Sequence, residues 1–123
     1  MASFRVSALA RADIRKILAT SIRQWGSEGG RRYAALLTAA LHAVAADPEG
    51  LMTRSRGEVM AGLRSRHTRH VRAKTFGAKV SSPVHLIYYQ VQQPNLIEIL
   101  RVLHERMDPV RHLGPSLSRH PPG

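Results

Sequence analysis

Residues Leu96 to Asp108, LIEILRVLHERMD, decide the fold of this chain. Six of the eight residues from Leu96 to Leu103 are aliphatic, and an aliphatic run of that length is typical of a strand covered on both faces. We therefore expect this segment at the centre of a sheet. Its two charged residues, Glu98 and Arg101, are an odd number of positions apart, so a regular strand would point them to opposite faces.

Arg101 is the residue of this stretch that most needs a partner. A guanidinium in the middle of an apolar strand has to be paired or placed in a groove. Glu98, Glu105 and Asp13 are the candidate partners for an ion pair that holds the sheet to a helix. The alternative for Arg101 is a surface role in binding a target or a partner protein.

Polar residues close the same stretch. His104 is expected to end the strand with its imidazole bonded to backbone. Glu105, Arg106 and Asp108 are placed to cap a short helix that follows.

The segments upstream predict an edge strand and a pair of helices. Ser3 to Ser7 has the alternation of a short edge strand, and Ser7 can cap the helix after it. Two apolar stripes at helical spacing follow, with Gly26 ending the first helix and a polar turn from Ser27 to Gly30. Because this turn is short, the helices must lie antiparallel as a hairpin, which stops before Asp47-Pro48. The core residues expected from the stripes are Ile14, Ile17, Leu18, Ile22 and Trp25, then Tyr33, Leu36, Leu37, Ala40, Leu41 and Val44.

The segments between the hairpin and the central stretch predict an antiparallel meander. Glu49 to Gly62 has little periodicity and is expected to be a loop. Leu63 to Lys74 alternates basic and smaller side chains, as a strand with a basic outer face would, and Thr75 to Pro83 is expected to be a connecting loop. Val84 to Val91 is the next strand, and Gln92 to Asn95 is the turn that leads into the central stretch.

These segments together predict an α+β fold. Its parts are an N-terminal strand, an antiparallel helix hairpin on one face of the sheet, a three-stranded antiparallel meander and a short C-terminal helix. Residues 1–113 are expected to form a single domain. The proline-rich tail, residues 114–123, is expected to be disordered.

The composition limits the possible functions. The chain has 123 residues, 19 Lys and Arg against 8 Asp and Glu, a net charge of +11 and no cysteine. A chain this basic associates with nucleic acid or with an acidic protein segment. The lack of cysteine excludes disulfides and thiolate metal sites. The N-terminal residues carry scattered charges and no apolar stretch, so we expect no signal peptide and a cytoplasmic location.

The basic residues are densest between Arg64 and Lys79, which favours an acidic partner for this region. His67 and His70 in the same region suggest a metal site. On a strand, however, their odd separation sends the two imidazoles to opposite faces, so no metal is expected there. The basic ladder consists of Arg64, Arg66, Arg69, Arg72, Lys74 and Lys79.

In their order and in their amino-acid sequences, these segments resemble the ParE branch of the RelE/ParE superfamily, the toxins of type II toxin-antitoxin systems. The resemblance implies a small toxin with the fold described above. It also implies a cognate ParD-like antitoxin with an acidic C-terminal segment, inhibition of DNA gyrase, growth arrest and plasmid stabilization. The segments that carry it are FRVSALARADIRKI (4–17), QWGSEGGRRYAALLTAAL (24–41), GLRSRHTRHV (62–71), PVHLIYYQV (83–91) and IEILRVLHERMDPVRHL (97–113).

Two alternatives to gyrase inhibition stay open at this point. RelE-type members of the superfamily cut messenger RNA, which requires a base, an acid and cations near the phosphate. Arg101 and His104 with Tyr89, or with its neighbour Tyr88, are the candidate residues for that reaction. The C-terminal region HLGPSLSRHPPG, however, carries no matching catalytic motif. The third possibility is a basic module that binds nucleic acid directly.

No cofactor and no metal are expected for any of these functions. The residues expected to bind the antitoxin or the target are Arg69, Arg72, Lys74, Arg101, His104 and Arg106.

Overall fold

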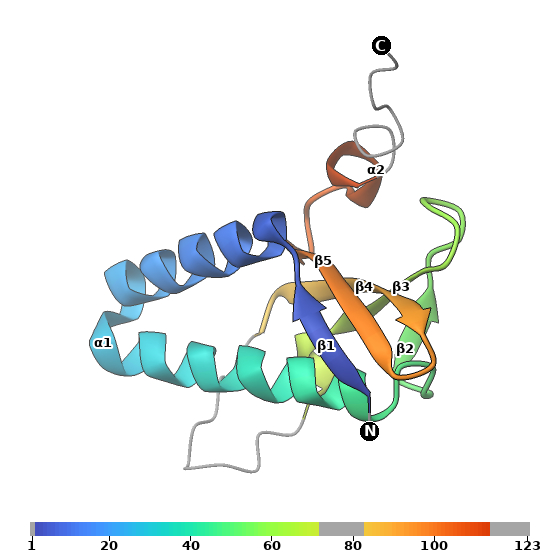
Figure 1. Ribbon diagram of the computed structural model, residues 1–123. Helices are drawn as coiled ribbons and strands as arrows, with labels where there is room; N and C mark the ends of the chain where they lie inside the picture. Colours follow the sequence, from blue (N-terminus) through green and yellow to red (C-terminus); the bar gives the residue numbers. More distant parts are fainter. Residues whose placement is uncertain (1, 72–82, 114–123) are drawn as a thin grey trace.

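A computed structural model describes residues 2–71 and 83–113. A five-stranded sheet forms its centre, in the order β1-β5-β4-β3-β2 (Figure 1). β1 (Ser3–Val6) pairs in parallel with β5 (Leu96–His104). On the other side of β5, β4 (His85–Gln93), β3 (Leu63–His67) and β2 (Thr53–Ser55) follow as antiparallel neighbours. The predicted position of the aliphatic stretch between two strands, and the α+β fold, are confirmed.

The helix hairpin is a single helical segment, α1 (Ala8–Ala46), bent sharply at Gly26. Ser7 caps it as predicted, because its Oγ accepts a hydrogen bond from the Ala10 N–H at 3.0 Å. Gly26 has φ 77°, a conformation that glycine adopts without steric cost. Helical geometry resumes after this one residue, so the predicted polar turn through Gly30 is instead the first turn of the second arm. The two arms run back along each other over one face of the sheet (Figure 1).

Two segments differ from the prediction in length or type. β2 lies within the stretch expected to be a loop, because an edge strand of three residues is too short to show a period. β3 ends at His67, and Thr68–His70 form a 3₁₀ turn. The expected continuation of this strand to Lys74, most of the expected loop from Thr75 and the expected disordered tail lie outside the described residues.

The centre of the sheet is buried on both faces, as the aliphatic stretch predicted. Ile97, Ile99 and Val102 of β5 pack under α1 in the larger hydrophobic cluster. Leu103 and Leu113 belong to a smaller cluster on the opposite face, where Leu113 follows the short helix α2 (Pro109–His112).

A β-bulge in β5 corrects one prediction. Glu98 pairs with Gln90 of β4, and Arg101 pairs with Tyr88, so Leu100 is the extra residue between them. Because Gln90 and Tyr88 are two positions apart, Glu98 and Arg101 belong to the same side of the sheet. The expectation of opposite faces was wrong because it assumed a regular strand.

The end of the first α1 arm lies outside the core, which corrects a second prediction. Ile14, Ile17 and Leu18 pack against the larger cluster, but Ile22 is 51% exposed and Trp25 is 63% exposed. The bend of α1 lies beyond the margin of the small sheet, so nothing in the sheet reaches these side chains (Figure 1). Within the described residues, no helix combines the length and the apolarity that crossing a membrane requires.

Candidate functional site

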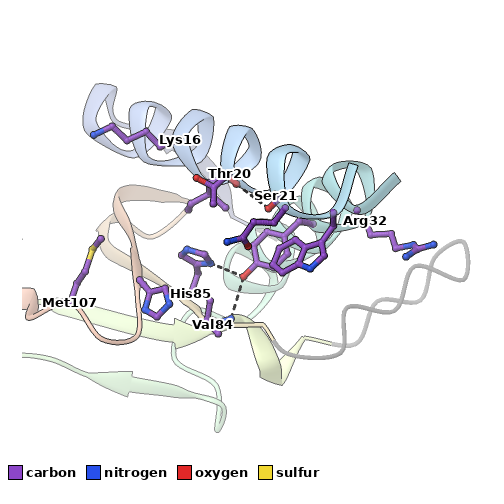
Figure 2. A pocket seen from close by; sticks show the side chains of 13 residues that line it. Lys16, Thr20, Ser21, Arg32, Val84, His85 and Met107 are labelled. Atoms are coloured by element: carbon purple, nitrogen blue, oxygen red, sulfur yellow. Dashed lines mark hydrogen bonds between the residues drawn. The ribbon is translucent and has the colours of Figure 1, made fainter. Parts of the chain in front are cut away.

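A groove of about 830 Å³ opens between the two arms of α1 and the ends of β4 and β5 (Figure 2). Ile17 and Trp25 contribute apolar surface from the first arm, and Met107 contributes it from the segment after β5. The polar residues on which the chemistry of the groove depends are Lys16, Arg32, Tyr33, His85 and His104.

Tyr33 and His85 form the floor of the groove. The backbone N–H of Val84 donates to the Tyr33 hydroxyl oxygen at 3.2 Å, and the same oxygen lies 2.6 Å from His85 Nδ1. This network is satisfied when the Tyr33 hydroxyl donates its proton to Nδ1. A neutral imidazole that accepts at Nδ1 carries its own proton on Nε2. Among the described residues, no acceptor is bonded to that Nε2–H.

His104 stands beside His85 at the end of β5. The two rings meet edge to face, with centroids 5.5 Å apart. His104 Nδ1 accepts the backbone N–H of Arg106 at 3.0 Å, which confirms the expected strand-end histidine bonded to backbone. Its Nε2 therefore also carries a proton, in the neutral ring as well as in the charged one.

The electrostatics of the groove favour an anion. Burial, together with the neighbouring imidazoles of His104 and His67, lowers the pKa of His85 to about 4, so this ring is neutral at pH 7. Lys16 and Arg32 extend at opposite ends of the groove (Figure 2). No Asp or Glu belongs to the described lining, and the nearby carboxylates of Asp13 and Glu105 are paired with Arg101 and His67. The groove therefore presents hydrogen-bond donors and cations beside an apolar wall.

Sequence reasoning missed this groove. Tyr33 and His85 are 52 positions apart, so no local spacing relates them. The bend at Gly26 brings Tyr33 over the end of β4, and Trp25 was assigned to the core because it falls on the apolar stripe. The only signal in the sequence was that this stripe is longer than a small sheet can cover.

Arg101 has the structural partner that the sequence required. Its Nε and Nη2 each donate to the Asp13 carboxylate at 2.8 Å, and its Nη1 donates to the His112 carbonyl at 3.1 Å. The Val102 N–H also donates to Asp13, at 2.9 Å. Of the three candidate partners, the structure selects Asp13. The hydrogen bonds to Asp13 raise the pKa of Arg101, and the pair ties α1 to β5 and α2.

The residues considered for RNA cleavage do not converge on an open site. Tyr88 pairs in register with Arg101, but it is 2% exposed and belongs to the smaller cluster. Arg101 and His104 both line a small hollow of about 160 Å³ next to the groove. Tyr89 is fully buried in the cluster under α1, where its hydroxyl donates to the Pro48 carbonyl. Burial raises the pKa of Tyr89, which makes its phenol harder to ionise.

His67 and Glu105 form a pair that the sequence did not indicate. His67 Nδ1 accepts the Arg69 N–H at 3.0 Å, so its Nε2–H donates to the Glu105 carboxylate at 2.7 Å. This hydrogen bond lowers the pKa of Glu105. Glu105 was expected to cap the last helix, but Asp108 alone has that role in the structure and accepts the Val110 N–H at 3.0 Å.

The prediction about a metal site at His67 and His70 assumed that both residues lie on one strand, and this assumption was wrong. His70 lies in the 3₁₀ turn and not on a strand, and the two rings meet edge to face with centroids 6.3 Å apart. Within residues 2–71 and 83–113, no group of three metal-ligating side chains is present.

The basic ladder is not a uniform outer face. Arg64 pairs in register with Tyr89 and is half-buried on the α1 side, where it donates to the Pro48 carbonyl at 3.1 Å and to Thr53 Oγ1 at 2.8 Å. Arg66, two residues on, is half-buried on the same side. Among the expected binding residues, Arg69 and Arg106 are exposed, whereas Arg72 and Lys74 lie outside the described residues, as does Lys79.

Comparison with known proteins adds independent findings. A family model described as the ParE toxin of the type II toxin-antitoxin system, parDE, matches residues 4–109. The chain is 31% identical over 114 residues to Toxin ParE1 of Caulobacter vibrioides, covering 93% of this chain and 100% of that relative. It is 28% identical over 110 residues to Toxin ParE1 of Mycobacterium tuberculosis, covering 89% of this chain and 96% of that relative.

Proposed function

Since the chain belongs to the ParE family of type II toxins, we propose that it inhibits DNA gyrase and is neutralised by a ParD-like antitoxin. The observation that carries the proposal is the family match over residues 4–109, which includes α1, the strands β2 to β5 and all of β1 except Ser3. The toxin assignment and the existence of an antitoxin partner follow from the family. The target, the kind of antitoxin and action in the cytoplasm are proposed.

The charge of the chain supports an acidic partner. A net charge of +11 on 123 residues is neutralised most simply by an acidic protein segment that covers the toxin. Such a segment gains both electrostatic attraction and, in the groove, apolar contact.

The placement of the candidate nuclease residues supports a binding mechanism over RNA cleavage. The Tyr89 hydroxyl is engaged with Pro48 inside the core, and the Arg101 guanidinium is engaged with Asp13. Neither group is available to a phosphate without disrupting the fold. A toxin that acts by occupying a surface of gyrase needs no such constellation.

The proposal is tested with purified toxin in a gyrase supercoiling assay. We expect inhibition of supercoiling or trapping of cleaved DNA, and we expect both effects to disappear when the toxin is premixed with its antitoxin. The antitoxin used is the product of the reading frame adjacent to that of the toxin.

The two alternatives predict different results. An unaffected gyrase, together with fragmented messenger RNA after induction, would replace the proposal with an endoribonuclease of RelE type. Binding to arbitrary duplex DNA that weakens steeply with salt, without growth arrest, would favour a basic nucleic-acid-binding module.

A further inference from the structure

We propose that the groove between the arms of α1 binds an acidic side chain of the antitoxin, whose carboxylate accepts hydrogen bonds from Nε2 of His85 and of His104. This inference rests on the proposed neutralisation by an antitoxin and goes beyond it, because it names the surface, the contacting atoms and the chemistry of the bound segment. Tyr33 and Val84 position the His85 ring and are not among the proposed donors.

The donor pair is held in place by bonds that leave one nitrogen of each ring available. Tyr33 occupies Nδ1 of His85 at 2.6 Å, and the Arg106 N–H occupies Nδ1 of His104 at 3.0 Å. Both rings consequently present Nε2–H, and the ring centroids are 5.5 Å apart. A carboxylate has two oxygens with about four lone-pair sites, so it can accept from both rings at once.

The surroundings of the donors indicate the kind of segment that carries the carboxylate. Ile17, Trp25 and Met107 supply apolar surface around the histidines, and Lys16 and Arg32 supply charge at the two ends. A matching segment has apolar residues that flank one acidic residue, with further acidic residues on either side. The Trp25 side chain is 63% exposed, and this segment would cover it.

The same surroundings argue against nucleic acid as the occupant. A groove that binds single-stranded nucleic acid has positive charge along its whole length, to follow the phosphate backbone. In this groove the positive charges of Lys16 and Arg32 lie at the two ends, and the lining also includes Ile17, Trp25 and neutral His85. A single carboxylate between apolar groups fits that arrangement, whereas a run of phosphates does not.

The test measures affinity for the antitoxin, using the product of the adjacent reading frame and the full toxin chain. Trp25 is the single tryptophan of the sequence, so its fluorescence reports directly whether the groove is covered. We expect a blue shift on binding. We expect the Lys16→Glu/Arg32→Glu variant to bind at least tenfold more weakly than the control Arg15→Glu/Arg23→Glu, which has the same net charge but alters exposed residues of α1 outside the groove.

A second pair of variants separates hydrogen bonding from packing. His104→Leu removes the donor and should weaken binding about tenfold or more, as expected for a hydrogen bond to a charged group. His104→Gln keeps an N–H donor near the position of Nε2 and should restore most of the affinity. On the antitoxin, changing the bound Asp or Glu to its amide should weaken binding to the wild-type toxin more than binding to the His104→Leu toxin, which keeps only the His85 donor.

The possible failures are distinguishable. Two results would overturn the groove inference and leave the proposed function standing, provided that the toxin binds the antitoxin. One is equal affinity of the groove variants and their controls, and the other is the absence of a shift in Trp25 fluorescence. If the groove variants instead lose binding to a single-stranded oligonucleotide, the ligand is nucleic acid and the inference is also overturned. If the wild-type toxin binds no antitoxin, the proposed neutralisation itself fails.

Discussion

Replacing Arg101 with Ala is expected to destabilise the protein by about 3 kcal/mol. In the native structure the Asp13 carboxylate accepts from Arg101 Nε and Nη2, both at 2.8 Å, and from the Val102 N–H at 2.9 Å. The substitution removes the first two bonds and the only countercharge within ion-pair distance among the described residues. It also removes the donor to the His112 carbonyl.

The magnitude follows from burial. Breaking a buried ion pair by removing one partner costs roughly 3–5 kcal/mol, because the remaining charge stays desolvated. The two side chains are 16% and 12% exposed, so some water reaches them and the lower end of that range is expected. The Asp13→Leu/Arg101→Met double variant removes both charges and should recover most of the loss.

Urea unfolding followed by far-UV circular dichroism measures this free energy of unfolding. Arg5→Ala is the matched control, because Arg5 contacts Glu98 at 3.8 Å with 58% of its side chain exposed. Removing this surface pair should cost less than about 1 kcal/mol. The reasoning is refuted if Arg101→Ala is as stable as the wild type, or if the Arg5 and Arg101 variants lose equal stability.

Three further predictions concern other parts of the molecule. In Gly30→Ala, the new Cβ would lie 2.5 Å from Ile22 Cγ1, so the Ile22 side chain or the arms of α1 must shift, and the loss of stability in thermal melts should be about 1–3 kcal/mol. The pKa of His85 is about 4 in the folded protein against 6.5 for the free side chain, so only the unfolded chain gains this proton between those values. The free energy of unfolding should therefore fall by about 2 kcal/mol as pH drops from 6.5 to 4, allowing for partial exposure of the ring, and His85→Gln should reduce this dependence in urea titrations. Arg69→Glu should weaken antitoxin binding in calorimetric titration while leaving the melting temperature unchanged, because the residue is exposed.

Local pattern was sufficient to predict most of the architecture. The aliphatic run from Leu96 to Leu103 identified the central strand, since only a strand covered on both faces has so little polar surface. Ser7 and Gly26 marked the start and the bend of the helical segment through preferences that depend on a few neighbouring residues. The unusual place of Arg101 in an apolar strand required a buried partner and left three candidates.

The amino-acid sequence alone thus determined the order of the elements apart from β2, the central strand and the need of Arg101 for a partner, because period, capping and burial of charge act over a few residues. Only the tertiary structure decided that Asp13 is that partner, and that a bulge at Leu100 places Glu98 and Arg101 on one side of the sheet. It also decided that Tyr33, His85 and His104 meet in one groove. These contacts join residues that are distant along the chain, and they depend on how far α1 extends over the sheet.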